Sequence, residues 1–218
     1  MSIRVIYNYV LVRLGIRHIL PSYYIRRTIV EECGEPIVNL SDDSAILSAG
    51  GHPLFGRKSV ITKLERIADK LSEQGMNLLV YELYRSVDRQ KQMRREQMIA
   101  LKNKYPELSE DEICKMTDKR VSAIGGGHQT GGAVDLTICR SDGTTLDMGT
   151  DYLEFNKRTE TYSTFIAQQQ IENRKLLNQM MTEEGFVNYP AEWWHFSYGD
   201  KMWAAYSHRK CAFYDIIT

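Results

Sequence analysis

The chain has 218 residues, 43% of them hydrophobic and 26% charged, and its 28 Lys and Arg residues balance 28 Asp and Glu residues. This length and composition are typical of a globular protein with a proper core, and they exclude a disordered chain and a nucleic-acid binder that works through bulk positive charge. Because no apolar run approaches the roughly 18 residues of a membrane-spanning helix, we expect neither a membrane span nor a nucleic-acid partner.

Residues 1–30 are unusual because they contain five arginines and no Asp or Glu. Such a segment loosely resembles a transit peptide or a basic amphipathic surface helix. We favour a third interpretation, a helix that packs on the domain. Asn8 and two tyrosines interrupt the apolar stretch 5–12, and no small-residue cleavage site follows it. We therefore expect no secretory signal and a cytoplasmic location.

From residue 48 onward the sequence predicts regular elements. We expect helices over 59–74, 86–104, 109–116 and 160–184, and strands over 77–84, 133–139 and 193–198. Loops are expected over 48–58 and, with many glycines, over 125–132. The first helix is indicated by apolar residues that recur at the helical period. Ser86 and Asp88 suit the N-terminus of the second helix, whose charged sequence leaves a narrow apolar face. The glycines of 125–132 are too many for regular structure, so His128 is expected on a loop that enters a strand.

The order of these elements is mixed, with connections of unequal length, which favours an α+β fold over a doubly wound sheet. The sequence has no repeats, no low-complexity tracts and only five prolines, so a single domain over 1–218 is the simplest organisation. The four cysteines are scattered without a CxxC pair. We therefore expect reduced thiols rather than disulfides or a structural zinc site.

Two of the five histidines lie in the most unusual local sequences, His128 in GHQTGGAVD and His195 in EWWH. The GGAV run between His128 and Asp135 permits a tight backbone path, so that a loop imidazole and a strand carboxylate can converge. His195, from a separate strand, would complete a three-ligand site. Two histidines and one aspartate, with the fourth position open to water, are typical of catalytic zinc. A lone histidine beside glycines is more often structural, so the prediction depends on all three residues together.

Glu192 is the best candidate for the general base that such a site needs. It lies three residues before His195, and residues three apart in a flat strand point to opposite faces. Glu192 must therefore lie on a bend that enters the strand, which Pro190 favours. The neighbouring tryptophans would make its surroundings less polar and raise the carboxylate pKa toward the range useful for a base.

These residues resemble a known family. HQTGGAVDLTI and EWWHF are similar to the two zinc motifs of the D-alanyl-D-alanine dipeptidases of the vancomycin-resistance type, within the wider group of D,D-carboxypeptidases and dipeptidases. DMGT at 147–150 and the segment NRKLLNQMMTEEGFVNYPAEWWHF resemble the helix that the family has between its two motifs and the family's final strand. The resemblance is good over 80–218 and poor before it. It implies one α+β domain with a central, mainly antiparallel sheet flanked by helices and a zinc site on the sheet.

The resemblance also implies roles for individual residues. His128, Asp135 and His195 would hold one Zn²⁺ per chain, and Glu192 would be the catalytic base. Arg85, at the end of YELYR, stands where the family has an arginine that stabilises the tetrahedral intermediate, a role that suits a cation beside a developing oxyanion.

Two departures from the family pattern concern the substrate and not the metal. Gly126 stands where the family usually has serine, two residues before the first zinc histidine. Tyr152 and Leu153 stand where it usually has Phe-Asp, whose aspartate is thought to hold the free amino group of the dipeptide. Glu154 would substitute for that aspartate after a shift of one residue. The candidate substrate contacts are thus Gly126, Tyr152, Glu154 and Trp194.

Three functions follow from this sequence. The first is zinc-dependent hydrolysis of D-Ala-D-Ala or a related small D-amino-acid dipeptide. The second keeps the zinc site but acts as a D,D-carboxypeptidase or endopeptidase on peptidoglycan stem peptides, because a site without its ammonium anchor should tolerate an acylated residue. The third is a binding protein without turnover. Cleavage of an N-blocked substrate distinguishes the first two, and absence of zinc would favour the third.

Overall fold

The computed structural model describes residues 3–14, 18–40, 45–118, 120–121 and 126–218. Its centre is a five-stranded sheet in the order β3-β5-β6-β8-β7. The strands are β3 (Ile46–Ser48), β5 (Met76–Glu82), β6 (Ala133–Arg140), β7 (Val187–Asn188) and β8 (His195–Ser197). The β3–β5 pair is parallel and the other pairs are antiparallel. The expected α+β fold with a mainly antiparallel central sheet is confirmed.

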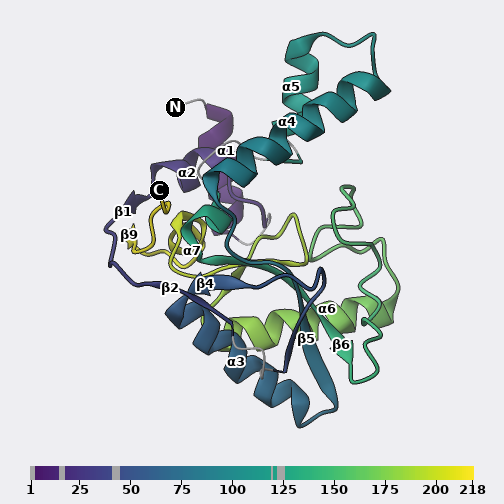
Figure 1. Cartoon of the computed structure of the whole chain (residues 1–218). Coiled ribbons are helices and arrows are strands. Elements are labelled where there is room, and N and C mark those ends of the chain that lie inside the picture. The colour runs from purple at the N-terminus through teal and green to yellow at the C-terminus, as the bar shows by residue number, and fades with distance from the viewer. Residues whose placement is uncertain (1–2, 15–17, 41–44, 119, 122–125) are drawn as a thin grey trace.

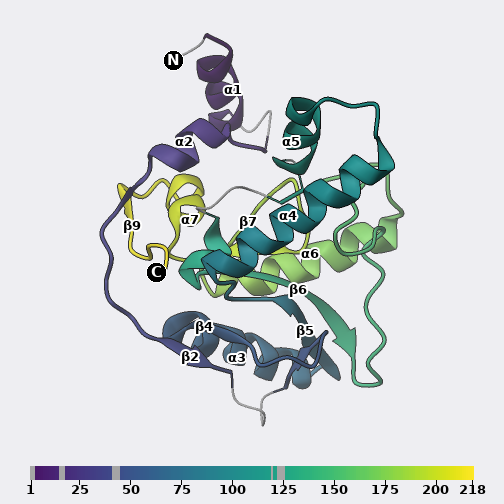
Figure 2. The ribbon, with the colours of Figure 1, turned by 45° about the horizontal axis from the view of Figure 1, so that its top comes forward.

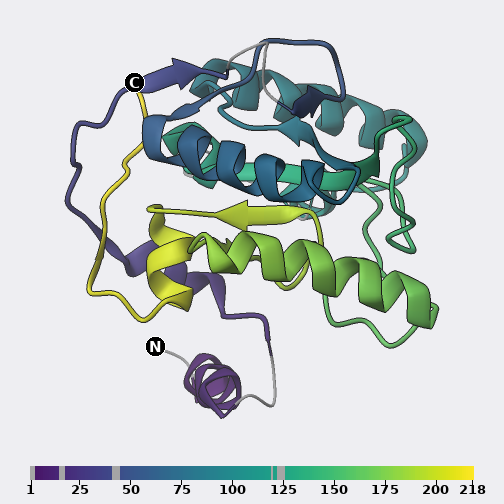
Figure 3. The ribbon, with the colours of Figure 1, turned by 90° about the horizontal axis from the view of Figure 1, so that it is seen from below.

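Helices α3 (Lys58–Ser72) and α6 (Gln168–Glu183) cover one face of this sheet (Figures 1 and 3). The buried residues of α3 form one apolar stripe at helical spacing: Val60, Ile61, Leu64, Ile67, Ala68 and Leu71. They share a core with alternate residues of β6, namely Val134, Leu136 and Ile138. Because neighbouring side chains in a strand point to opposite faces, Asp135 lies on the other face of β6.

On that other face, α4 (Val87–Lys104) and α5 (Glu110–Asp118) form a hairpin that extends away from the sheet (Figures 1 and 2). Ser86 caps α4, because its hydroxyl accepts a hydrogen bond from the Arg89 amide. The short 3-10 helix η1 (Gly127–Thr130) leads directly into β6. The helices expected over 59–74, 86–104 and 109–116 and the strands expected over 77–84 and 133–139 are confirmed within a few residues.

The remaining elements lie beside the central sheet. Helix α1 (Ile3–Arg13) and helix α2 (Ser22–Arg27) lead to β1 (Ile29–Val30), which pairs in parallel with β9 (Cys211–Ala212). Strands β2 (Ile37–Asn39) and β4 (Phe55–Arg57) form an antiparallel pair, and α7 (Lys201–Tyr206) follows β8. Every helix in the described part of the chain is too short or too polar to cross a bilayer. The cytoplasmic location and the single domain over 1–218 stay predictions.

Four expected elements were wrong in part. Residues 127–130 of the glycine-rich loop expected over 125–132 form η1, so His128 lies on a short 3-10 helix, and residue 125 lies outside the described residues. The helix expected over 160–184 begins only at Gln168. Before it, the Thr161 hydroxyl donates to the Asn188 side chain (2.5 Å) and the Thr161 amide donates to the Pro190 carbonyl (2.9 Å). Side-chain and long-range bonds of this kind compete with helix formation. The strand expected over 193–198 is shortened to β8, and part of the loop expected over 48–58 is strand β4.

Candidate active site

Three predicted ligand residues converge at the centre of the sheet. His128 belongs to η1, Asp135 is the third residue of β6, and His195 opens β8 directly opposite Asp135 in the antiparallel register. One potential ligand atom from each residue lies within 4.8 Å of the others, and His128 and Asp135 are buried. The structure therefore brings together residues that are far apart in the sequence.

Asp135 lies between the two histidines. Its Oδ1 is 2.8 Å from His195 Nδ1 and 3.3 Å from His128 Nε2. His128 Nδ1 is 2.8 Å from the Leu83 carbonyl oxygen, which can only accept a hydrogen bond. A neutral His128 therefore carries its proton on Nδ1, and its Nε2 lone pair faces Asp135. This is the arrangement in which a backbone carbonyl orients a metal-binding imidazole.

Glycines allow the backbone to pass closely through this region. A Cβ on Gly127 would lie 2.1 Å from Asp200 Oδ2, and a Cβ on Gly132 would lie 2.4 Å from the Tyr198 carbonyl oxygen. Gly131 has a φ of 72°, a conformation that other residues rarely adopt. The tight path that the GGAV run predicted is therefore present, and side chains at these positions would displace His128 or Asp135.

The electrostatics of the site favour an ionised Asp135. Burial alone would raise the pKa of this carboxyl group, but the neighbouring imidazoles of His128 and His195 outweigh burial and hold the pKa well below its usual range. Burial opposes protonation of His195, yet its hydrogen bond to Asp135 and the nearby carboxylates raise its pKa. Asp135 thus offers a charged, buried carboxylate oxygen beside two imidazoles.

The second oxygen of Asp135 has its own partner. Asp135 Oδ2 accepts a hydrogen bond of 3.0 Å from the Tyr152 hydroxyl. The Tyr152 ring stacks on Tyr81 with centroids 4.2 Å apart and an interplanar angle of 6°, and it meets the edge of Trp194. These rings fix the hydroxyl on Oδ2, so that Oδ1 alone faces the histidines.

Glu192 lies on the turn that connects β7 to β8, as its spacing from His195 required. The Glu192 amide donates to the Tyr189 carbonyl (2.9 Å), and the His195 amide donates to the Glu192 carbonyl (3.2 Å). Burial raises the pKa of the Glu192 carboxyl group, against the opposing charge of His195. A carboxylate with a raised pKa is suited to accept and return a proton.

Arg85 lies three residues after the end of β5, beside His128 and Asp135. Its amide donates to the His128 carbonyl (3.1 Å), and its guanidinium is held by Glu82 and by Gln90. Asp135, Tyr152 and Glu192 are close enough to Arg85 to influence its pKa, which burial lowers. The structure thus places the predicted cation at the same centre as the predicted base.

Nothing in the local sequence pointed to Asn188, whose side chain binds the turn that carries Glu192 and His195. The Asn188 side-chain amide donates to the carbonyl oxygens of Glu192 (3.1 Å) and His195 (3.0 Å), and Asn188 itself is buried. It therefore holds Glu192 and His195 on one turn. Asp200 was also not predicted; its buried carboxylate lies against Gly127, next to His128, and accepts from the Ser197 hydroxyl and the Trp203 amide, each at 2.8 Å.

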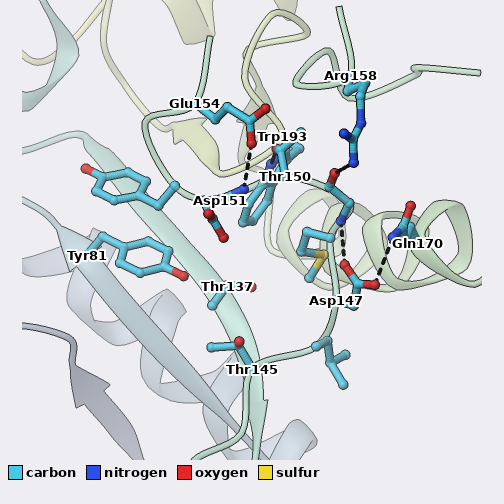
Figure 4. Close-up of a pocket in the computed structure, with 14 residues that line it drawn as sticks. Tyr81, Thr137, Thr145, Asp147, Thr150, Asp151, Glu154, Arg158, Gln170 and Trp193 are labelled. Carbon is cyan, nitrogen blue, oxygen red and sulfur yellow. Dashed lines mark hydrogen bonds between the residues drawn. The ribbon is translucent and has the colours of Figure 1, made fainter. Parts of the chain in front are cut away.

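The predicted substrate contacts lie in different places. Trp194 is 0% exposed, so it lies behind Tyr152. The Glu154 carboxylate turns back to accept from the Asp151 amide (3.2 Å) at the rim of a cavity of about 440 Å³ (Figure 4). Gly126 precedes η1 and donates its amide to the Gln129 side chain. Direct contact of these residues with a substrate stays a prediction.

A separate groove of about 580 Å³ begins at Arg85 and Tyr152. Its lining includes Arg89, Met93, Glu96, Gln97 and Ala100 of α4, together with Arg120 and Val121. It also includes Leu153 and Phe155, which are 50% and 39% exposed. The groove therefore adjoins the candidate site through Arg85 and Tyr152.

Comparison with known proteins agrees with the motifs. A peptidase family described as D-ala-D-ala dipeptidase (peptidase M15) matches residues 48–215, further toward the N-terminus than the resemblance over 80–218. D-alanyl-D-alanine dipeptidases of Escherichia coli and Synechocystis are 31% and 36% identical over 140 and 104 residues. These alignments cover 64% and 40% of this chain, and the chain spans only 64% and 42% of the two relatives.

Solved structures show the same fold. A vancomycin-resistance D,D-pentapeptidase, VanY, in complex with Zn(II) aligns with a TM-score of 0.50 and 16% identity over 86% of this chain and 92% of its own. The LD-carboxypeptidase LdcB aligns with a TM-score of 0.51 and 20% identity over 84% of this chain and 77% of its own. With a family match that covers most of its length, this chain belongs to the D-Ala-D-Ala dipeptidase family of peptidases.

Proposed function

We propose that this protein is a zinc peptidase that hydrolyses D-Ala-D-Ala or a closely related D-amino-acid dipeptide. The observation that carries the proposal is the convergence of His128, Asp135 and His195 with Glu192 and Arg85 beside them. The proposed substrate is further supported by the relatives named above, which are D-alanyl-D-alanine dipeptidases.

The donor set fits zinc. Zinc accepts imidazole nitrogen and carboxylate oxygen at about 2.0–2.2 Å, and three such atoms already lie within 4.8 Å of one another. His128, Asp135 and His195 would hold one ion per chain and leave a position open for water or substrate. When bound, zinc acts as a Lewis acid toward water and the scissile carbonyl.

The other residues supply proton transfer and charge stabilisation. Glu192 takes a proton from the attacking water and returns it to the amine that leaves, for which a raised pKa is favourable. Arg85 stabilises the negative charge that develops on the carbonyl oxygen, and Glu82 and Gln90 hold its guanidinium in place before substrate binds. Because the Arg85 guanidinium is already held, it needs little reorganisation during the reaction.

The proposal is tested by alanine release from D-Ala-D-Ala with the zinc-loaded protein, with and without a chelator. We expect cleavage that the chelator abolishes and added zinc restores. L-Ala-L-Ala is the control for stereochemistry. Zinc binding without hydrolysis of any D-amino-acid peptide would instead favour a binding protein.

One observation favours a second candidate, a D,D-carboxypeptidase that acts on N-blocked or longer peptides. Leu153 exposes an apolar side chain to the groove beside Arg85. The two acidic residues that line the groove, Glu82 and Glu96, are each paired with an arginine. Within the described part of the groove, therefore, no unpaired carboxylate is left to hold a free ammonium group.

Leu153→Asp is expected to raise kcat/KM for free D-Ala-D-Ala by about tenfold or more, because a charged hydrogen bond to the ammonium is typically worth ~1.5–3 kcal/mol. Leu153 has a φ of 63°, a conformation that aspartate tolerates better than leucine, so the variant should fold. The measurement is the ratio of kcat/KM for D-Ala-D-Ala to that for N-acetyl-D-Ala-D-Ala. Leu153→Asn, which lacks the charge, is the matched control. An unchanged ratio would show that residue 153 does not contact the amino end.

Tyr152→Phe is expected to weaken zinc binding by about 10–100-fold, as loss of an outer partner of a metal ligand typically does. The phenylalanine keeps the stack on Tyr81 but leaves Asp135 Oδ2 without its hydrogen bond. Competition with a chromophoric chelator measures the affinity. Tyr81→Phe removes a hydroxyl from the same stack without touching a ligand and serves as the control. Equal affinities for Tyr152→Phe and the parent would contradict the role.

A further inference from the structure

Helix α1 has an exposed apolar stripe that the peptidase site does not use. Ile3, Tyr7 and Leu14 are 85%, 59% and 67% exposed, and Ile6 and Val10 are 43% and 44% exposed. Residues spaced by three and four positions lie on one face of a helix, so these five side chains form a continuous stripe. A solvated helix normally presents charged and polar residues on that face.

The opposite face of α1 packs on the protein. The Tyr9 ring stacks on Tyr24 of α2 with centroids 4.1 Å apart. Val12 lines a cavity together with Leu20 and Tyr206, and the Arg13 guanidinium lies 2.7 Å from His208 Nε2. The expectation that this segment packs on the domain is thus correct for one face only. Figures 2 and 3 show α1 at the outside of the molecule, away from the central sheet.

The charge of this region has one sign. Residues 1–30 contain five arginines and no acidic residue. Arg13 is exposed at the end of α1, and Arg26 and Arg27 are exposed on α2. The apolar surface continues onto the neighbouring Ile19 and Ile29, which are also exposed. The surface therefore combines an apolar stripe with positive charge beside it.

The apolar stripe and the neighbouring arginines together favour an anionic membrane surface over a second copy of the chain as the partner. A second copy of the same surface would bring arginines against arginines, which opposes self-association. An anionic bilayer offers phosphates to the arginines and an apolar layer to the stripe, which is how interfacial helices bind. At about 1.5 Å per residue, α1 is about 16 Å long. That length suits a helix that lies in the interface rather than one that crosses a bilayer.

We propose that α1 and α2 form a membrane-surface arm that docks the protein on anionic lipid. In this arrangement the stripe of Ile3, Ile6, Tyr7, Val10 and Leu14 enters the boundary of the acyl chains. Arg13, Arg26 and Arg27 lie at the level of the phosphates. The arm is separate from the residues of the candidate active site, so this inference does not depend on the proposed function.

The experiment is flotation of the full chain with vesicles of phosphatidylcholine alone or mixed with phosphatidylglycerol, at low and high salt. We expect the parent to float with the mixed vesicles only, and less so at high salt. The double variant Tyr7→Asp/Leu14→Asp should lose at least about tenfold in partitioning, because both side chains would leave the apolar layer. Ile99→Asp makes the same kind of change at a 62% exposed position on α4 and should bind like the parent.

A second variant controls for the possibility that Tyr7→Asp/Leu14→Asp loses binding only because α1 unfolds. Arg26→Gln/Arg27→Gln keeps the apolar stripe and should reduce binding to the mixed vesicles several-fold and weaken its salt dependence. Peptidase activity without vesicles should be the same for all variants. A parent that does not bind mixed vesicles overturns the proposal. So does a parent dimer that Tyr7→Asp/Leu14→Asp converts to monomer in sedimentation, since the stripe would then be an interface between copies.

Discussion

Glu192→Ala is expected to lower turnover of the dipeptide by about 10²–10⁴-fold, the contribution typical of a positioned general base. The carboxylate lies on the turn before His195, where Asn188 holds the Glu192 backbone rather than its side chain. Removal of the side chain should therefore leave the turn and the three ligands in place. Steady-state kinetics and a zinc assay on the same preparation measure the two effects separately.

Glu192→Gln refines this test because it keeps the size of the side chain and removes only the base. It should be about as inactive as the alanine variant and should bind one zinc per chain. Burial raises the pKa of Glu192, and ionising such a group costs folding stability as the pH rises through its folded-state pKa. The glutamine variant, which carries no charge, should thus be at least as stable as the parent near neutral pH. Either variant with parental turnover would exclude Glu192 as the base.

The pH profile of the parent gives an independent check on the same residue. A base must be ionised to act, so kcat/KM should fall as the pH drops through the Glu192 pKa. Because burial raises this pKa, the acid limb should lie above the ordinary range of a glutamate. A profile of kcat/KM for D-Ala-D-Ala measures it, and an acid limb at or below the ordinary glutamate pKa would mean that the positive charges around Glu192, including a bound metal ion, outweigh its burial.

Much of this architecture follows from local sequence. The apolar period of α3 and the β-prone runs of β5 and β6 each specify a local conformation, and the structure agrees. His128 and Asp135 were predictable as candidate ligands because they flank a run of glycines. Such a run is needed where the backbone passes close to other groups, and the structure has close approaches there. Local signals of this kind are readable without the fold.

Other features depend on contacts between distant segments and could not be read locally. The Leu83 carbonyl orients His128, and the Tyr152 hydroxyl orients Asp135, only because β5, β6 and the loop after β6 meet in one register. The segment before α6 illustrates the same limit. The sequence of this segment favours a helix, but Thr161 forms hydrogen bonds with Asn188 and Pro190, which are distant in the chain. These tertiary hydrogen bonds take the place of a helical turn.

His195→Ala is expected to abolish zinc binding and activity together, which distinguishes a ligand from a base. Two remaining ligands cannot hold zinc firmly, since its catalytic sites use three protein ligands. Asp135 would also lose its shortest contact, the 2.8 Å approach to His195 Nδ1, and would keep a buried charge with one imidazole. Zinc per chain after dialysis, together with D-Ala-D-Ala hydrolysis, measures both losses.

His52→Ala provides the matched control. It also replaces a histidine with alanine, but His52 is exposed in a loop outside the site. It should retain one zinc and parental activity. The pair of results also separates the roles argued above: Glu192→Ala keeps the metal and loses turnover, whereas His195→Ala loses the metal first and turnover as a consequence. If His195→Ala bound zinc as tightly as the parent, the metal would have to be held elsewhere. The convergence of His128, Asp135 and His195 would then be a buried hydrogen-bond cluster rather than a metal site.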